Sequence, residues 1–545
     1  GMTMRRLVEA AGPETQPDLS PDGRMLVYAS AAGGNLDIYF MRVGGDRAIN
    51  LTSGFTGPDG TPAFSPDGER IAFRSERDGG GIFTMGATGE SVRRVTEFGF
   101  DPAWSPDGTK IVFSTEEVYD PYSREQQATL WVATLESGET TEITGLGIDA
   151  VQPAWSPGGE RIAYWANTSG QRDIWTVPAG GGEPVAVTQD LATDWSPVWS
   201  PDGNTLYFSS DRSGSMNLWG VAIDPQTGGV AGEPFPVTSG TRSVGYASLS
   251  AGGDRMAVMS YDRTFDVTLY DMDALLQGRL EVRATLPRQS VRWCAPSYDA
   301  TWLGCTTIGA QEDLVVVSSD GSETRRLMDD VHKDRAPLWT PDGQSMAFYS
   351  TRGGTWEYWW MRTDGSGLKQ LSAFEDFGGG VMSADGRQLT LNANFEAVVI
   401  IDVDPETPVT VESARKLKLP DGYPVSRFWP GAWSPDGRQI AGSEAYEDGK
   451  RTTFAVYDLA AETLRPLPGI EAGETNASVG GWLPDSRRLL LEDDRGLVLV
   501  DVITGEYRVL HEGFGTYTMF LSGDGKTLMV ETETLDSEIW MLTLE

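Results

Sequence analysis

A four-residue turn motif recurs along the whole chain and constrains the fold more than any other feature. Six stretches read Ser/Thr-Pro-Asp-Gly, and they begin at Ser20, Ser65, Ser105, Ser200, Thr340 and Ser434. Six degenerate copies begin at Ser156, Ser250, Ser297, Ser383, Leu483 and Ser522. The mean spacing is about 45 residues, which is typical of a four-stranded propeller blade. The repeat therefore predicts an array of blades.

Each repeat has the same internal pattern. In the third repeat, DPAW precedes the motif at Ser105, and TKIVFST, TLWVATL and TTEIT follow it. Short β-branched and aromatic runs bounded by Gly, Pro, Asp and Ser are typical of strands, and each repeat has four of them. Pro and Gly fit the turn positions of the motif, so we interpret its Asp as a turn residue without chemistry. Aromatic residues of the third strand, such as Trp175, are interpreted as packing between blades and not as a ligand platform.

The repeat PxWSPDGxxIAFxSxRxGxxDIYxM resembles the propeller repeat of the TolB family, the periplasmic component of the Tol system. The same repeat occurs in tricorn protease and in the propellers of prolyl-oligopeptidase-like peptidases. The resemblance covers essentially the whole chain and implies an all-β propeller fold. It does not assign a function, because one fold hosts many activities.

Twelve repeats exceed the roughly four to eight blades of a single ring. We therefore expect two β-propellers of six four-stranded blades each, formed by residues 1–278 and 279–545, and a 7+5 division stays open. Residues 4–8 match the fourth strand of a blade although no blade precedes them. We expect them to close blade six beside residues 267–272, and residues 280–284 to close blade twelve.

The charge balance limits the classes of partner. The 79 acidic and 43 basic residues give a formal net charge of −36, which repels phosphate backbones and anionic lipids. No apolar run approaches the ~18–20 residues of a membrane helix. We expect a monomer that neither binds nucleic acid nor inserts into a membrane. The compartment stays open: cytoplasmic if Met2 is the native start, periplasmic as in the TolB family if an upstream signal was removed.

Catalytic motifs are sparse. No G-x-S-x-G nucleophile elbow occurs, and His332 and His511 are the only histidines, so we expect no catalytic residue, no metal and no cofactor. Cys294 and Cys305 fall in adjacent predicted strands of one blade. They form either a disulfide or a pair of small buried thiols.

Binding residues are expected where the fourth strand of one blade leads into the next blade, because those loops open on the channel mouth. The candidates are Asp101, Asp149, Gln152, Asp194 and Trp195 in the first ring, and Asp334, Arg335 and Trp429 in the second. The acids of the first ring suit a cationic group, whereas the second ring could accept an anion or a sugar face.

One loop, residues 116–129, is longer than its counterparts and carries Tyr119 and Tyr122. It is either a partner-binding finger or a surface insertion. Taken together, these features predict a non-enzymatic TolB-like double propeller that binds a protein, a peptide or a small cationic ligand through its channel-mouth loops. The alternatives are an accessory or substrate-gating propeller of a peptidase or hydrolase system, and a propeller lyase or lactonase.

Overall fold

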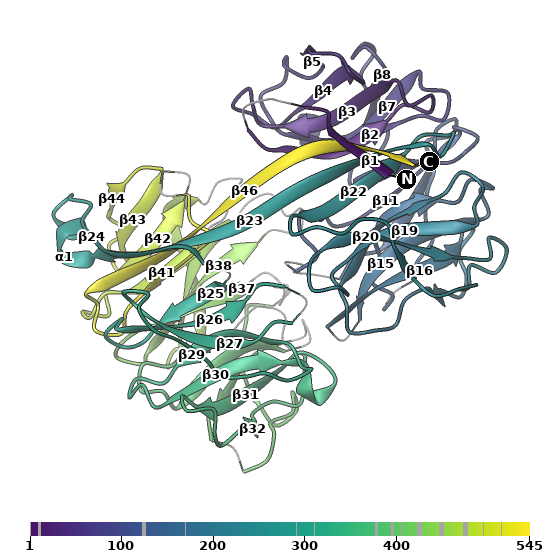
Figure 1. Ribbon diagram of the computed structural model, residues 1–545. Coiled ribbons are helices and arrows are strands. Elements are labelled where there is room, and N and C mark those ends of the chain that lie inside the picture. Colours follow the sequence, from purple (N-terminus) through teal and green to yellow (C-terminus); the bar gives the residue numbers. More distant parts are fainter. Residues whose placement is uncertain are drawn as a thin grey trace. The chain divides into compact units, whose positions relative to one another are not determined.

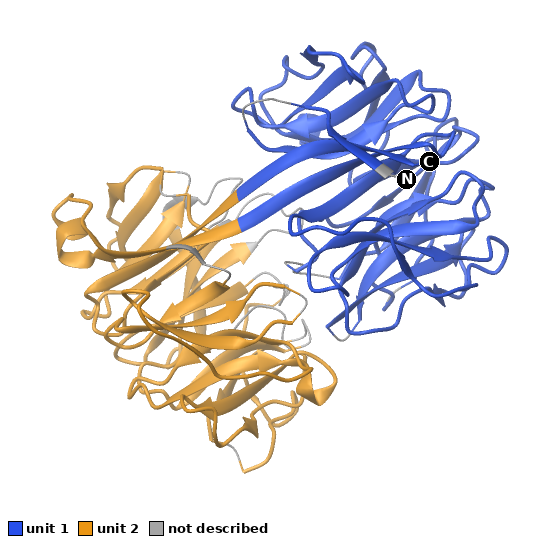
Figure 2. Ribbon diagram, in the orientation of Figure 1, with its two compact units in different colours: residues 1–263, 535–545 blue, residues 264–534 orange. Residues whose placement is uncertain are grey.

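β-Strands account for nearly all of the regular secondary structure in the described residues (Figure 1). The computed structural model describes residues 2–544 except 9–11, 123–126, 146, 169, 290, 310, 376–379, 394–396, 405, 422–427, 446–451, 472–477, 494 and 514. Two compact units are present, residues 1–263 with 535–545 (unit 1) and residues 264–534 (unit 2) (Figure 2).

Five blades of unit 1 are four-stranded antiparallel sheets whose strands pair in chain order. Their strands are β2 (Glu14–Leu19), β3 (Met25–Ser30), β4 (Asp37–Arg42), β5 (Ala48–Asn50); β6 (Asp59–Phe64), β7 (Arg70–Ser75), β8 (Gly81–Gly86), β9 (Arg93–Arg94); β10 (Phe100–Trp104), β11 (Lys110–Ser114), β12 (Leu130–Thr134), β13 (Thr140–Glu142); β14 (Val151–Trp155), β15 (Arg161–Thr168), β16 (Gln171–Pro178), β17 (Val185–Ala186); β18 (Asp194–Trp199), β19 (Thr205–Ser210), β20 (Asn217–Ala222) and β21 (Phe235–Pro236). A 3₁₀ turn, η1 (Arg77–Gly79), follows β7.

Five blades of unit 2 have the same topology. Their strands are β25 (Val291–Pro296), β26 (Trp302–Thr307), β27 (Leu314–Ser318), β28 (Thr324–Arg326); β29 (Asp334–Trp339), β30 (Ser345–Ser350), β31 (Glu357–Arg362), β32 (Lys369–Gln370); β33 (Val381–Met382), β34 (Gln388–Ala393), β35 (Ala397–Asp402), β36 (Arg415–Lys416); β37 (Phe428–Trp433), β38 (Gln439–Ala445), β39 (Thr452–Asp458), β40 (Thr463–Glu471); β41 (Ser478–Trp482), β42 (Arg488–Asp493), β43 (Gly496–Asp501) and β44 (Tyr507–His511). A 3₁₀ turn, η2 (Thr351–Gly353), follows β30.

The sixth blade of each unit is assembled from distant segments. The strands involved are β1 (Met2–Arg6), β22 (Ser243–Leu249), β23 (Arg255–Asp271), β24 (Val282–Gln289), β45 (Thr518–Leu521) and β46 (Thr527–Leu544). The two long strands, β23 and β46, pair with each other and cross from one unit to the other. Unit 1 therefore has the order β22-β23-β46-β1 and unit 2 has β45-β46-β23-β24, with helix α1 (Met272–Leu276) after β23.

The first strands of the six blades contact one another in a closed circle within each unit, β2-β6-β10-β14-β18-β22 in unit 1 and β25-β29-β33-β37-β41-β45 in unit 2. The predicted architecture of two six-bladed propellers is thus confirmed, and the innermost strand of each blade is its first. We refer to the propellers as ring one (unit 1) and ring two (unit 2).

The turn motif closes the hairpin between the first two strands of a blade. In blade three, Ser105 Oγ donates to Asp107 Oδ1 at 2.6 Å and accepts the amide of Lys110 at 2.9 Å. Gly108 has φ of 69°, a left-handed conformation that costs glycine little. The bonds from Ser105 and from the Thr109 amide lower the pKa of Asp107 to about 2. The Asp therefore acts as a turn acceptor, as the sequence indicates.

Tryptophans that precede the motif join neighbouring blades. In four of them the indole nitrogen donates to a backbone carbonyl in the first strand of the preceding blade: Trp104 to Ala63 at 3.0 Å, Trp199 to Ala154 at 3.1 Å, Trp339 to Ala295 at 3.0 Å and Trp482 to Ala432 at 3.1 Å. Because the indole is otherwise buried against the blade, this bond satisfies its only polar atom and fixes the packing of the two blades.

Ring closure follows a different path from the expected one. Residues 2–6 pair with 540–544 of β46, and residues 282–289 pair with 265–270 of β23. The expectation had these two third strands the other way round. No Gly or Pro interrupts β23 (17 residues) or β46 (18 residues), so each continues straight into the other ring. Accordingly, residues 264–278 lie with ring two and 535–545 with ring one, whereas the expected limits of 1–278 and 279–545 treat each ring as one continuous segment.

This closure predicts that β1 contributes strongly to stability. Deleting residues 2–8 should lower the free energy of unfolding by several kcal/mol, because β46 is then left with an unpaired edge. Chemical denaturation of the deletion variant against the full chain measures the loss. Replacing the exposed residues Arg93 and Arg94 of β9 by alanine is the control and should change stability little. A deletion variant that unfolds at the same denaturant concentration as the full chain would contradict the closure.

Candidate functional site

A left-handed residue marks the inner strand of every blade of ring one. Each sits at a β-bulge with φ between 47° and 54°; these residues are Gln16, Thr61, Asp101, Gln152, Ser196 and Tyr246. The strand register shifts at all six positions. A left-handed non-glycine residue is strained by about 1–2 kcal/mol, and bulges of this kind re-aim side chains beside functional sites. The repeat thus places six side chains, one from each blade, around the centre of ring one.

The long loop of blade three packs over this centre. Val118 and Ala128, near the two ends of the loop, are buried in one apolar cluster with Trp165 and Trp195 of blades four and five. Tyr122 packs against the same cluster. The described part of the loop therefore lies across ring one, while residues 123–126 fall outside the described residues.

Polar contacts tie the loop to three other blades. The Tyr122 hydroxyl donates to Asp211 at 2.8 Å, and Arg263 holds Asp120 in an ion pair at 2.8 Å. Arg172 of blade four lies 5.4 Å from the centre of the Tyr122 ring. Tyr122 is therefore a buried anchor. Tyr119, in contrast, is 60% exposed.

Acidic side chains gather where the loop leaves blade three. Burial raises the pKa of Asp101 well above its usual range, and Glu117 and Glu116 raise it further. Burial also raises the pKa of Glu117, whose carboxylate accepts the Tyr119 hydroxyl at 2.6 Å. The Oδ2 atom of Asp101 is buried and has no hydrogen-bond partner among the described residues. We call Asp101, Glu116 and Glu117 the acidic cluster.

Other candidates of ring one are engaged in internal contacts. Asp149 accepts the amides of Ala128 at 3.0 Å and Asn167 at 2.7 Å, and so holds the base of the loop. Gln152 accepts the indole N–H of Trp165 at 2.7 Å. Asp194 is fully buried and pairs with Arg212 at 2.9 Å. Burial raises its pKa to about 6, although Arg212 opposes the shift.

Trp195 belongs to the core of ring one. It is fully buried and its ring meets that of Tyr246 edge-on, with centroids 5.2 Å apart. The Tyr246 hydroxyl in turn donates to the carbonyl of Val118 in the loop. Asp101 and Trp195 are thus linked through Val118 of the loop and Tyr246.

Ring two has a buried cationic centre. Arg335 donates to Glu312 at 2.6 and 2.8 Å, and Arg292 reaches the same carboxylate at 2.9 Å. The guanidinium of Arg335 lies 4.2 Å from the ring centre of Trp356. Asp334 is fully buried and accepts Arg352 at 3.0 Å.

The remaining residues of ring two lie apart from this centre. Trp429 is half-buried on β37, and no contact joins it to Arg335 among the described residues. Cys294 and Cys305, which the sequence left open, form a disulfide between β25 and β26, with Cα atoms 4.1 Å apart. Within the described part of the chain, no group of three or more His, Cys, Asp or Glu side chains is arranged to hold a metal ion. The described helices include none that is long and apolar enough to cross a membrane.

Comparison with known proteins agrees with this architecture. The family profile of the TolB beta propeller domain matches residues 2–120 and 100–282, just over half of the chain. The chain belongs to the TolB beta propeller domain family. No curated protein matches the sequence significantly.

Solved structures resemble this TolB-type protein in fold alone. A putative TolB from Agrobacterium tumefaciens is 19% identical over 51% of this chain and 83% of its own, with a TM-score of 0.24. An oligogalacturonate lyase from Vibrio parahaemolyticus is 15% identical over 68% and 94%, with a TM-score of 0.34. Tricorn protease is 11% identical over 95% and 62%, with a TM-score of 0.30. These similarities do not assign an activity to this TolB-type chain.

The sequence did not indicate Tyr246 at this site, and it placed Glu117 only in the long loop of residues 116–129, without linking it to Asp101. Tyr246 occupies the same repeat position as Gln16, Thr61, Asp101 and Gln152, but it precedes Ala247, whereas the others precede a proline. Alignment of the repeats on the x-Pro step therefore passes over it. Glu117 lies in an insertion that no other repeat shares, so the repeat gives no signal for its position.

The acidic cluster predicts a pH-dependent effect on stability. A carboxyl whose pKa is raised in the folded state stabilises the fold below its unfolded pKa and loses that contribution as pH rises through the raised value. Asp101→Asn cannot ionise, so its melting temperature relative to the unchanged chain should rise as the pH is raised above about 4, the ordinary pKa of an aspartate. Thermal denaturation across this pH range measures the difference.

Asp107→Asn is the matched comparison on the same blade. Because hydrogen bonds lower the pKa of Asp107, its contribution is present at neutral pH and disappears as pH falls through about 2. This variant should therefore be less stable than the unchanged chain at pH 7. If the melting temperatures of the Asp101→Asn and Asp107→Asn variants, relative to the unchanged chain, changed with pH in the same way, the carboxylates of the acidic cluster would not repel one another.

Proposed function

We propose that this TolB-type double propeller is a non-enzymatic binding scaffold whose ring one accepts a cationic group of a protein or peptide at the acidic cluster. The observation that carries the proposal is the buried Oδ2 atom of Asp101, which has no hydrogen-bond partner among the described residues. The backbone amide of Val118 bonds to this carboxyl. A buried carboxylate oxygen without a partner is nevertheless costly, and a lysine or arginine side chain would supply the missing donor and charge.

Charge and exposure support the same ligand. Asp101 and Glu117 are half-buried, and Tyr119 in the same loop region offers an exposed aromatic ring. Arg74 is nearby but already pairs with Glu76 and lies 4.3 Å from the ring centre of Phe100. Acids crowded in a region of low dielectric focus a negative potential, which attracts cations more strongly than dispersed surface charge does.

The raised pKa values in the acidic cluster predict that binding of a cation is coupled to the release of protons. The pKa values of Asp101 and Glu117 are raised, so each carboxyl gives up its proton less readily than an ordinary exposed one. A bound cation favours the ionised carboxylates and should displace those protons. Binding at this site is therefore expected to release protons, which diffuse attraction to exposed acids does not require.

Titration calorimetry with a short acetylated lysine- and arginine-rich peptide tests the proposal. Asp101→Asn and Glu117→Gln should each weaken binding by roughly tenfold, which is about 1.4 kcal/mol. Glu136→Gln and Glu139→Gln, at exposed acids of the same blade, are the matched controls and should change it little. Affinity should fall as salt rises, because the pairing is electrostatic.

The same titration in two buffers of different ionisation heat reports the proton release. Equal losses in the cluster variants and in the controls would show that the peptide binds only by diffuse charge. Binding without proton release would show that the peptide does not bind at the acidic cluster.

A further inference from the structure

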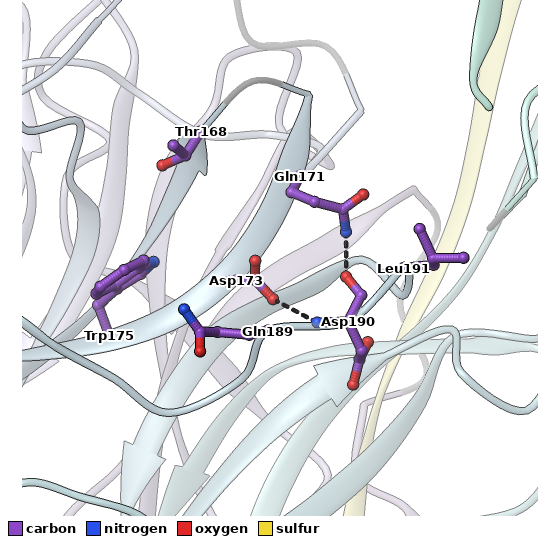
Figure 3. A pocket seen from close by; sticks show the side chains of 7 residues that line it. All are labelled: Thr168, Gln171, Asp173, Trp175, Gln189, Asp190 and Leu191. Carbon is purple, nitrogen blue, oxygen red and sulfur yellow. Dashed lines mark hydrogen bonds between the residues drawn. The ribbon is translucent and has the colours of Figure 1, made fainter. Parts of the chain in front are cut away.

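A depression lies on blade four of ring one, and none of its lining residues belongs to the acidic cluster. Gln171, Asp173 and Trp175 alternate along β16, so their side chains emerge on the same face of the blade. Thr168 at the end of β15 and residues 189–191 after β17 complete a cavity of about 490 Å³ (Figure 3). This volume lies within the roughly 300–1,000 Å³ of small-molecule sites. We call it the blade-four pocket.

The pocket contains a hydrogen-bond donor that the fold leaves unused. The Nε1 atom of Trp175 is buried and has no partner among the described residues. In the neighbouring blade, Trp131 holds the same position, and its indole nitrogen donates to Thr129 Oγ1 at 3.1 Å. Blade four has Asp173 where blade three has Thr129, and the carboxylate of Asp173 is turned to other partners.

Acceptors stand beside this donor. Asp173 Oδ1 accepts Thr188 Oγ1 at 3.1 Å and the amide of Asp190 at 3.4 Å, and its other oxygen points away from Asp190 (Figure 3). Gln171 donates its amide group to the carbonyl of Asp190, with its own oxygen turned outward in Figure 3. Gln189 adds an exposed carboxamide, which is both a donor and an acceptor.

The formal charge of the pocket is largely compensated. Arg212 pairs with Asp190 at 3.3 Å as well as with Asp194. Burial raises the pKa of Asp173 to about 7, and the neighbouring Asp194 adds to the shift. Near neutral pH its carboxyl is therefore protonated in a large part of the molecules and can donate as well as accept.

This mixture of donors and acceptors discriminates between ligand classes. An ammonium or guanidinium group only donates, so it would leave the buried indole N–H without a partner. A hydroxyl group donates and accepts at once and satisfies both kinds. The indole also offers an apolar surface for C–H groups.

We propose that the blade-four pocket binds a neutral saccharide unit, with ring hydroxyls bonded to Trp175 Nε1, Asp173 and Gln189. The proposal is independent of the cationic ligand of the acidic cluster, because no residue is shared. It assigns Trp175 a ligand contact, whereas its repeat position alone indicates packing between blades.

Ligand-observed NMR on the full chain, with glucose, galactose, mannose and maltotriose as probes, tests the proposal. At least one probe should receive saturation from the protein. In ¹⁵N-tryptophan-labelled protein, the indole resonance that disappears in Trp175→Phe should shift on titration. Trp175→Phe should weaken binding by roughly tenfold and Gln189→Ala by a smaller factor.

Trp131→Phe is the matched control, since it removes the equivalent indole from blade three, and it should leave binding unchanged. Melting curves of all variants confirm that they are folded, and Asp101→Asn should bind the probes as the unchanged chain does. Absence of saturation transfer to all four probes, or equal weakening by Trp131→Phe and Trp175→Phe, would overturn the proposal. Tetramethylammonium that shifts the Trp175 resonance at lower concentration than the hexoses do would also overturn it, because the pocket would then be a cation site.

Discussion

The pairing of β23 and β46 completes the sixth blade of each propeller. In ring one these strands are the second and third strands of the sixth blade, and in ring two they exchange those roles. The same backbone ladder therefore closes both circles of inner strands. Side chains reinforce each closure: Asp18 of β2 accepts the amide of Phe64 at 2.6 Å and the hydroxyl of Ser248 at 2.5 Å, and Glu531 of β46 accepts the amide of Cys294 at 3.0 Å.

The repeat stabilises the blades with a few recurring residue types, whereas the residues at its inner positions differ from blade to blade. The turn motif and the indole-to-carbonyl bonds use the same few residue types in many blades, so they carry no specificity. The left-handed residues of the inner strands differ from blade to blade, from Gln16 to Asp101 to Tyr246. An insertion in one blade, the loop that begins at Glu116, then uses the centre of ring one as its own packing surface. Specific chemistry arises where the repeat is broken, at the acidic cluster and at Asp173.

Much of the architecture could be predicted from the sequence because its signals are local and repeated. The number of blades, their four strands and the role of the turn Asp follow from twelve copies of one motif. The exchange of third strands could have been inferred from the absence of Gly and Pro in residues 256–270 and 528–541. The candidate sites were harder to predict, because a carboxylate in a loop looks the same whether it faces solvent or a partner. Asp149 and Asp194 turned out to be bonded within the fold, and Tyr122 to point inward, since their partners Asn167, Arg212 and Asp211 are set by tertiary packing.

The strand exchange has a consequence for the order in which the chain is made. Residues 535–544, which complete ring one, leave the ribosome only after the whole of 264–534 has been translated. At about 5–20 residues per second, that delay is on the order of tens of seconds. During this time five finished blades of ring one flank an incomplete sixth, whose exposed backbone is open to pairing with other chains. Translation of ring two begins later, but all of its strands are synthesised before ring one is complete. The nascent chain therefore cannot fold domain by domain from its N-terminus.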